Sequence, residues 1–216
     1  CLIVVMVFMS ALSPASDARS RYAELVVDGK SGRVLIARNV DDRKYPASLT
    51  KIMTLYMMFE LLDKGTLRLD QKLKTSRRAA GQPASKLGLR QGERITVRQA
   101  ILALVTKSAN DVPTMVAETI AGSEFKFALM MTQRARDLGM NRTTFRNASG
   151  LPNRRQKSTA RDMARLAIAI RRDFPHYFEF FSRTSFRFHG NTYNTHNNLL
   201  GKIRGVDGIK TGYIRA

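Results

Sequence analysis

Three short groups of polar residues stand in a fixed order along the chain. Ser48 precedes Lys51 by three positions, Ser108 precedes Asn110 by two, and residues 210–212 read Lys-Thr-Gly. A serine hydroxyl is a weak nucleophile until an adjacent base takes its proton. A lysine can be that base when burial among apolar side chains lowers its pKa. The set therefore indicates nucleophilic chemistry at Ser48.

The surroundings of Ser48 separate it from chance copies of the same spacing. Ser48 stands at the start of a long apolar stretch, where a helix would place Lys51 on the same face and backbone N–H groups near the hydroxyl. The spacing recurs at Ser123 and Lys126, where helix N-capping explains the serine. Lys-Ser-Gly at 30–32 falls in a tight turn. Taken alone, Ser48 and Lys51 would also fit a helix cap beside a surface lysine.

Periodicity gives the elements that must position these residues. A strand, turn and strand are expected from Tyr22 to Ile36, and a central buried helix from Leu49 to about Asp63. Irregular chain is expected over 66–95 and a loop over 141–157. Further helices are expected over 96–105, 110–121, 123–138, 160–171 and 174–181, and strands over 184–188, 192–194 and 208–214. Strands at both ends predict an α+β fold with an antiparallel sheet packed against a helical region.

Charge and composition limit the classes of molecule that the protein is expected to bind. The chain has 37 Lys and Arg against 17 Asp and Glu, a formal net charge of +20. These basic residues are scattered rather than gathered in stripes or tails, so no nucleic-acid partner is expected; an anionic surface, such as membrane or cell wall, fits better. No metal-ligand spacing is present, and the three histidines fall outside the motifs and are expected to be structural. We expect no metal and no cofactor.

The beginning of the chain predicts a targeting segment. A single cysteine, Cys1, excludes an intrachain disulfide, and the apolar run after it is too short to span a bilayer. Small residues follow through Ala18, as in a secretory signal. We expect residues 1–18 to be a partial signal peptide and 19–216 the functional domain. That domain would then lie outside the cytoplasmic membrane, in a periplasmic or other extracytoplasmic location.

Longer stretches around the motifs resemble the D-alanyl-D-alanine carboxypeptidase family, the low-molecular-mass penicillin-binding proteins of the serine type. The stretches are YPASLTK at 45–51, TKSAND at 106–111, NASGLP at 147–152 and GVDGIKTG at 205–212. The S-x-x-K, S-x-N and K-T-G set is shared with active-site serine β-lactamases. The resemblance runs from Tyr22 to the end and implies a fold similar to the β-lactamase/transpeptidase fold.

The resemblance also implies catalytic roles. Ser48 would form an acyl-enzyme with the penultimate D-Ala of a peptidoglycan stem peptide, releasing the terminal D-Ala. Lys51 would be its general base, and Ser108 would relay a proton to the leaving amine.

Five further residues would bind the substrate by the same resemblance. Asn110 would hold the substrate amide and orient Lys51, while Lys210 and Thr211 would grip the terminal carboxylate. Gly212 would let the backbone approach the substrate closely. The backbone N–H group of Tyr213, with that of Ser48, would form the oxyanion hole.

Two departures from the family pattern are visible. Ile214 stands where the family more often has a small hydroxylated residue. The sequence stops at Ala216, whereas two more antiparallel strands follow the Lys-Thr-Gly motif in the family. We therefore expect the C-terminal strands to be missing and the sequence to be a fragment at both ends.

Other functions remain open at this point. The same residues would serve a D,D-endopeptidase that cuts cross-linked peptidoglycan, and a non-catalytic basic module that binds cell wall or nucleic acid is an alternative of another kind. A class A β-lactamase is disfavoured, because no glutamate lies in the loop 141–157 to activate a deacylating water. We therefore expect β-lactams to be covalent inhibitors rather than substrates.

Overall fold

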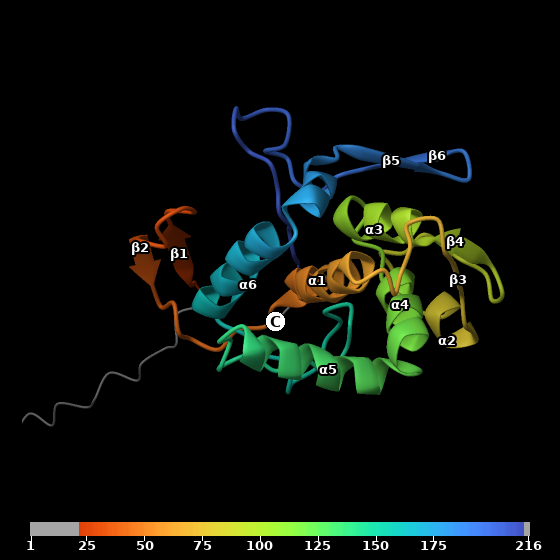
Figure 1. Cartoon of the computed structure of the whole chain (residues 1–216), viewed down its shortest axis with the longest axis horizontal. Helices are drawn as coiled ribbons and strands as arrows, with labels where there is room; N and C mark the ends of the chain where they lie inside the picture. Colours follow the sequence, from red (N-terminus) through yellow and green to blue (C-terminus); the bar gives the residue numbers. More distant parts are fainter. Residues whose placement is uncertain (1–21, 214–216) are drawn as a thin grey trace, which may run out of the picture.

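The helices gather around one central helix. The computed structural model describes residues 22–213, so the expected signal segment at 1–18 and Ile214 lie outside this part. Helix α1 (Thr50–Asp63) lies in the middle, with the longer helices arranged around it (Figure 1). Most of its side chains are buried, as its apolar composition predicts.

The other long helices match their predicted positions within a few residues. They are α3 (Val97–Val105), α4 (Asp111–Ala121), α5 (Glu124–Asp137) and α6 (Ala160–Asp173). A capping box of Thr96 and Gln99 opens α3, and serine and threonine hydroxyls cap α5 and α6. The expected short helix after α6 is a 3₁₀ helix, Pro175–Ser182.

The expectation of irregular chain over 66–95 is wrong in part. Strand β3 (Lys72–Lys74) pairs with β4 (Arg94–Thr96), and the short helix α2 (Arg77–Ala80) lies between them. Elements of three or four residues are too short to show a hydrophobic period, so the polar composition concealed them.

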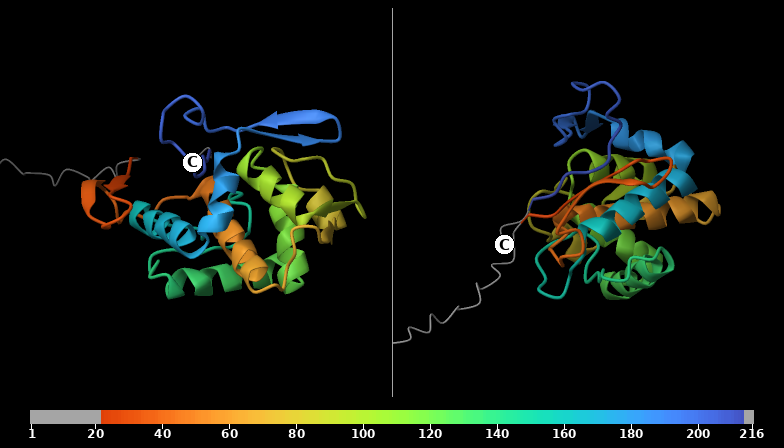
Figure 2. Two further views of the ribbon diagram at one scale, coloured as in Figure 1. Left: turned by 45° about the horizontal axis from the view of Figure 1, so that its top comes forward. Right: turned by 90° about the vertical axis from the view of Figure 1, so that its left-hand side faces the viewer.

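The strands form hairpins at the periphery (Figure 2). Strand β1 (Glu24–Val27) pairs with β2 (Val34–Arg38), and β5 (Ser185–Phe188) pairs with β6 (Asn191–Asn194). The predicted α+β class and antiparallel pairing are confirmed, but within residues 22–213 the strands make three separate two-stranded sheets.

The strand expected at 208–214 is wrong for 208–213, which form no strand. A strand needs a neighbour to pair its backbone groups, and no described strand pairs with this segment. The segment instead makes isolated contacts, such as Asn197 Nδ2 donating to the carbonyl of Gly208 at 3.4 Å.

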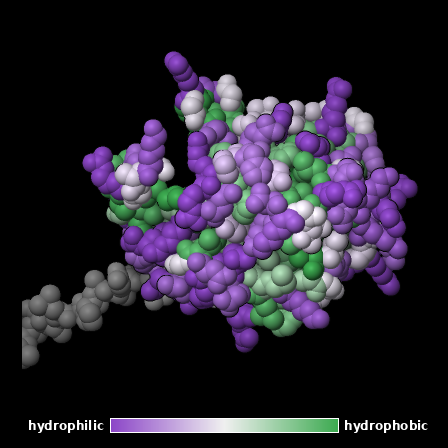
Figure 3. Space-filling view, in the orientation of Figure 1, coloured by the Kyte–Doolittle hydropathy of each residue, from purple (hydrophilic) through white to green (hydrophobic). Residues whose placement is uncertain are grey.

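One apolar core joins α1 to the segments around it. Phe59 of α1 stacks against Tyr177 and Phe180 of the 3₁₀ helix and meets Phe174 and Phe181 edge-on. Hydrophilic side chains cover most of the face in Figure 3, with smaller apolar areas between them. These aromatic contacts fix α1, and with it the residues at its first turn.

In the part of the chain described, no helix has the length and apolar character to cross a membrane.

A buried carboxylate fixes the loop that precedes α3 to the start of α4. Asp111 is fully buried, and its two oxygens accept hydrogen bonds from the backbone N–H groups of Leu87, Gly88, Leu89 and Val112 at 3.0–3.2 Å. Within residues 22–213, the backbone N–H groups at 87–89 have no other hydrogen-bond acceptor.

Replacing Asp111 with alanine should therefore destabilise the fold. Leaving three loop N–H groups without an acceptor is expected to lower the free energy of unfolding by about 3 kcal/mol, measured by urea denaturation. Asp70→Ala is the control, because the Asp70 side chain is 73% exposed. Equal denaturation midpoints for the two variants would contradict this account of the loop.

Candidate active site

Ser48 is presented at the head of the central helix. It occupies the 3₁₀ turn Ala47–Leu49, which runs directly into α1. Leu49 N donates to the carbonyl of Pro46 at 3.0 Å and closes the turn. The Ser48 side chain is half-buried and faces a pocket of about 450 Å³. The nucleophile predicted from the sequence is thus accessible and rigidly held.

Lys51 lies one turn further along and is fully buried. Its Nζ atom is 3.2 Å from Ser48 Oγ, 2.9 Å from Asn110 Oδ1 and 2.6 Å from the carbonyl oxygen of Ser149. The pKa of Lys51 is lowered to about 7, mainly by burial and in part by the positive charge of Lys210, while the charge of Asp111 opposes the shift. A substantial share of Lys51 is therefore neutral at neutral pH.

The neighbours of Nζ decide where its lone pair points. A neutral amine has two N–H donors and one lone pair, and Asn110 Oδ1 and the Ser149 carbonyl are acceptors only. With the two N–H groups directed at them, the lone pair is left for the Ser48 hydroxyl. This arrangement is what a general base for Ser48 requires.

Ser108 and Asn110 come from the turn between α3 and α4, and both line the pocket. Ser108 has a positive φ of 56°. Its buried Oγ has no hydrogen-bond partner among the described residues, which leaves the hydroxyl available to a bound molecule. Asn110 Nδ2 donates to the carbonyl of Pro83 at 3.2 Å, and this contact turns Oδ1 toward Lys51.

The third group reaches the same pocket from the other end of the chain. Thr211, Gly212 and Tyr213 line it together with Ser48. A Cβ atom on Gly212 would lie 3.4 Å from Ser48 N, so the Gly212 backbone passes close to the Ser48 turn. Tyr213 is 80% exposed.

Lys210 is placed differently from its neighbours. Its Nζ atom donates to the carbonyl of Thr211 at 2.9 Å, and its side chain does not line the pocket. Burial lowers the pKa of Lys210 to about 8. Its charge acts on the site through the lowered pKa of Lys51.

The pocket also contains residues that the motifs did not indicate. They are the segment Gly150–Pro152, the pair Ala84 and Ser85, and His196. His196 was expected to be structural. Burial lowers the pKa of His196, and Lys210 and Lys107 add to the shift. The Ser149 carbonyl was also missed, since a backbone oxygen leaves no side-chain signature; the conspicuous stretch NASGLP around it was the available signal.

A serine paired with a buried lysine at the head of the central helix is the arrangement of an active-site serine with its adjacent base. The family model for the peptidase S11 D-alanyl-D-alanine carboxypeptidases matches residues 9–216. The chain belongs to this family.

Individual relatives agree with that assignment. The chain is 34% identical over 227 residues to D-alanyl-D-alanine carboxypeptidase DacF of Bacillus subtilis, covering 98% of this chain and 58% of the relative. Penicillin-binding protein 5 from Haemophilus influenzae superposes with a TM-score of 0.85 at 32% identity, over 89% of this chain and 57% of that one. Penicillin-binding protein D2 from Listeria monocytogenes, solved in an ampicillin-bound form, superposes with a TM-score of 0.80 at 32% identity. The match covers 89% of this chain and 79% of that one. The chain spans about half the length of the curated relatives it matches.

Gly150 holds the loop after α5 against the Ser48 turn. Its φ is +88°, and a Cβ atom there would lie 1.8 Å from the carbonyl oxygen of Ala47 and 2.9 Å from Ser48 N. No side chain fits that space, so glycine is required for the loop to reach the turn.

Gly150→Ala should displace the Ser48 turn and destabilise the protein. The positive φ costs about 1 kcal/mol and forced overpacking about 1–3 kcal/mol more, measured by thermal denaturation. The control is Gly92→Ala, which has a φ of +84° with nothing within 4 Å of its Cβ position. Equal losses in the two variants would show that backbone conformation alone, and not the contact with Ala47, requires Gly150.

Proposed function

We propose that residues 19–216 belong to a serine-type D-Ala-D-Ala carboxypeptidase that removes the terminal D-Ala from peptidoglycan stem peptides through an acyl-enzyme on Ser48. The observation that carries the proposal is the position of Lys51 Nζ, 3.2 Å from Ser48 Oγ and hydrogen-bonded to two neutral acceptors. Membership in the carboxypeptidase family supports the choice of substrate.

The reaction begins with proton transfer from Ser48 to Lys51. Ser48 Oγ attacks the carbonyl carbon of the penultimate D-Ala, and the backbone N–H groups of Ser48 and Tyr213 stabilise the oxyanion. The carbon–nitrogen bond then breaks, and the proton held by Lys51 passes through the hydroxyl of Ser108 to the leaving amine, which returns Lys51 to its neutral form. Water hydrolyses the ester and regenerates Ser48.

Residues of the second and third motifs bind the substrate. Asn110 holds its amide while fixing Lys51, and Thr211 binds the terminal carboxylate with Lys210, whose Nζ atom would turn from the Thr211 carbonyl to do so. Gly212 allows the peptide to lie close to the backbone. A carboxylate beside a cation and a hydroxyl forms charge-assisted hydrogen bonds.

β-Lactams would acylate the same serine and remain attached, because the loop 141–157 has no glutamate to activate water. The net charge of +20 suits a protein that works beside anionic cell-wall polymers or the membrane surface, outside the cytoplasmic membrane. The same machinery would serve an endopeptidase, and the products formed from linear and cross-linked muropeptides distinguish the two activities.

Ser48→Ala should abolish covalent labelling of the full-length protein by a fluorescent penicillin and abolish D-Ala release from a stem pentapeptide, because no other group can form the acyl-enzyme. Ser123→Ala is the matched control, since Ser123 heads the second S-x-x-K sequence but caps α5 through Lys126 N. It should be labelled like the wild type. Labelling that survives in Ser48→Ala would refute the proposed nucleophile.

The pH dependence of acylation should follow the neutral form of Lys51. The acylation rate constant is expected to rise about tenfold per pH unit below a midpoint near 7 and to level off above it, because only the neutral amine can accept the Ser48 proton. Stopped-flow measurement with a chromogenic penicillin gives the profile.

Lys210→Gln should move this midpoint to higher pH. Lys210 has a pKa of about 8 and is mostly charged where Lys51 titrates, so removing its charge raises the pKa of Lys51. Lys126→Gln, an exposed lysine outside the pocket, should leave the midpoint in place. A midpoint that stays fixed or moves to lower pH in Lys210→Gln would contradict the coupling of the two amines.

A further inference from the structure

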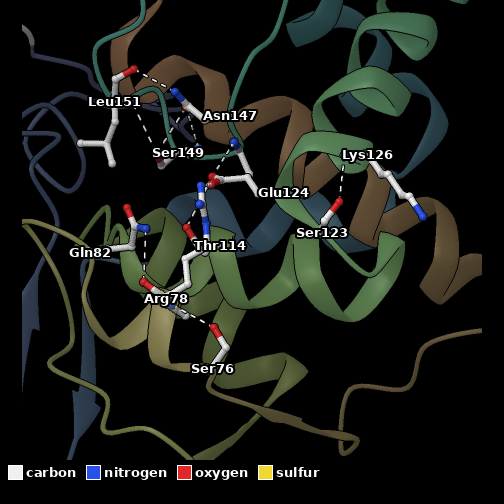
Figure 4. Close-up of polar contacts among 12 residues, drawn as sticks. Ser76, Arg78, Gln82, Thr114, Ser123, Glu124, Lys126, Asn147, Ser149 and Leu151 are labelled. Atoms are coloured by element: carbon white, nitrogen blue, oxygen red, sulfur yellow. Dashed lines mark hydrogen bonds and ion pairs between the residues drawn. The ribbon is translucent and has the colours of Figure 1, made fainter.

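Glu124 is a buried carboxylate whose contacts lie outside its own helix. It stands in the first turn of α5 and is 5% exposed. One oxygen accepts from Arg78 Nη2 at 2.7 Å, and the other from Ala148 N at 3.2 Å and Thr114 Oγ1 at 3.4 Å. In Figure 4, Glu124 lies between Arg78 and the loop that carries Asn147 and Ser149.

The contact with Ala148 leads to the Lys51 amine. The carbonyl of Ala148 accepts from Thr54 Oγ1 at 2.8 Å, so this residue is fixed through its N–H by α5 and through its C=O by α1. The next carbonyl along the chain, that of Ser149, accepts from Lys51 Nζ at 2.6 Å. The position of that acceptor therefore depends on the hydrogen bond to Glu124.

The contact with Arg78 leads to another part of the pocket wall. Arg78 belongs to α2, and its carbonyl accepts from Gln82 Nε2 at 3.3 Å. The chain continues to Ser85, which lines the pocket and whose carbonyl accepts from Asn110 N at 2.7 Å. One carboxylate thus contacts the loop that supplies the Ser149 carbonyl and the helix that leads to Ser85, the residue bonded to Asn110 N.

We propose that Glu124 is a positioning residue for acylation of Ser48, which acts by holding the Ser149 carbonyl where it receives one N–H of Lys51. The inference rests on the function proposed above. If the Ser149 carbonyl moves, one N–H of the amine loses its direction, and the lone pair is no longer confined to the Ser48 hydroxyl. Glu124 touches no reacting atom, so its loss should lower the acylation rate constant and leave the affinity for the β-lactam nearly unchanged.

A role in helix stability alone predicts a different pattern of variants. A carboxylate in the first turn of a helix stabilises it through its charge, whichever acidic residue supplies it. Glu124→Gln keeps an acceptor oxygen at the same reach without the charge. Glu124→Asp keeps the charge but is one methylene shorter, so it draws the oxygen away from Ala148 N.

The test measures acylation of the full-length protein by a labelled penicillin, separating the maximal rate constant from the half-saturating concentration. Because small displacements of catalytic groups can cost about 10²-fold, Glu124→Asp and Glu124→Ala should lower the maximal rate about 10- to 100-fold. Glu124→Gln should stay within about threefold of the wild type by the same reasoning, and all half-saturating concentrations should change little. Ser123→Ala is the stability control, because it weakens the same helix end without touching Ala148.

The outcomes separate this inference from the proposed function. A wild-type acylation rate constant in Glu124→Asp, together with a lowered one in Glu124→Gln, would show that the charge of residue 124 matters and the length of its side chain does not. That result would overturn the positioning role. A fall in Ser123→Ala equal to that in Glu124→Asp would overturn it as well, since helix destabilisation would then account for both. If the wild-type protein is not acylated at Ser48, the proposed function fails first, and this inference fails with it.

Discussion

An amine buried without a counter-charge is the constraint on which the rest of the site depends. Lys51 is fully buried, and within residues 22–213 it forms no ion pair; its partners are a hydroxyl, an amide oxygen and a backbone carbonyl. Removing an ammonium from water is costly, and the group responds by giving up its proton. To keep the amine buried, the chain must hold it within a rigid apolar core. The apolar side chains of α1 provide that core. The apolar character of α1 is thus a chemical requirement as well as a packing one.

The arrangement of the elements follows from the need to bring distant segments to one amine. The core fixes α1, the turn before α4 supplies Asn110, and the loop after α5 supplies the Ser149 carbonyl. Contact between that loop and the Ser48 turn is permitted only by the missing side chain of Gly150. Helix α1 therefore carries the base, a turn and a loop carry its acceptors, and the hairpins lie at the periphery (Figure 1). The segment with Thr211 and Gly212 reaches the pocket as irregular chain.

Much of this could be predicted from residue patterns, and the exceptions share a physical cause. The long helices were predictable because their apolar period and their caps are local, as at Thr96. Ser48 and Lys51 could be recognised because their side chains do the chemistry. The role of the Ser149 carbonyl could not be recognised, because every residue has a carbonyl. Only the folded chain determines which carbonyl accepts from Lys51. Glu124 resembles any acidic residue near a helix start until the fold buries it. The segment 208–213 has the composition of a strand, but pairing depends on neighbours that composition does not specify.

The nearest acid shows how the site keeps its base neutral. A carboxylate bonded to Lys51 would stabilise the ammonium, and the lone pair that Ser48 needs would be lost. Asp111 follows Asn110 directly and raises the pKa of Lys51, yet the stronger effect of burial prevails. Both of its oxygens accept hydrogen bonds from backbone N–H groups of the loop at 87–89 and of Val112, and neither forms an ion pair with the amine. Glu124 is satisfied in the same way by Arg78, Thr114 and Ala148. These two buried acids are thus bonded to backbone and structural partners, and the amine is left with neutral acceptors, which is the condition for a lysine to act as a base near pH 7.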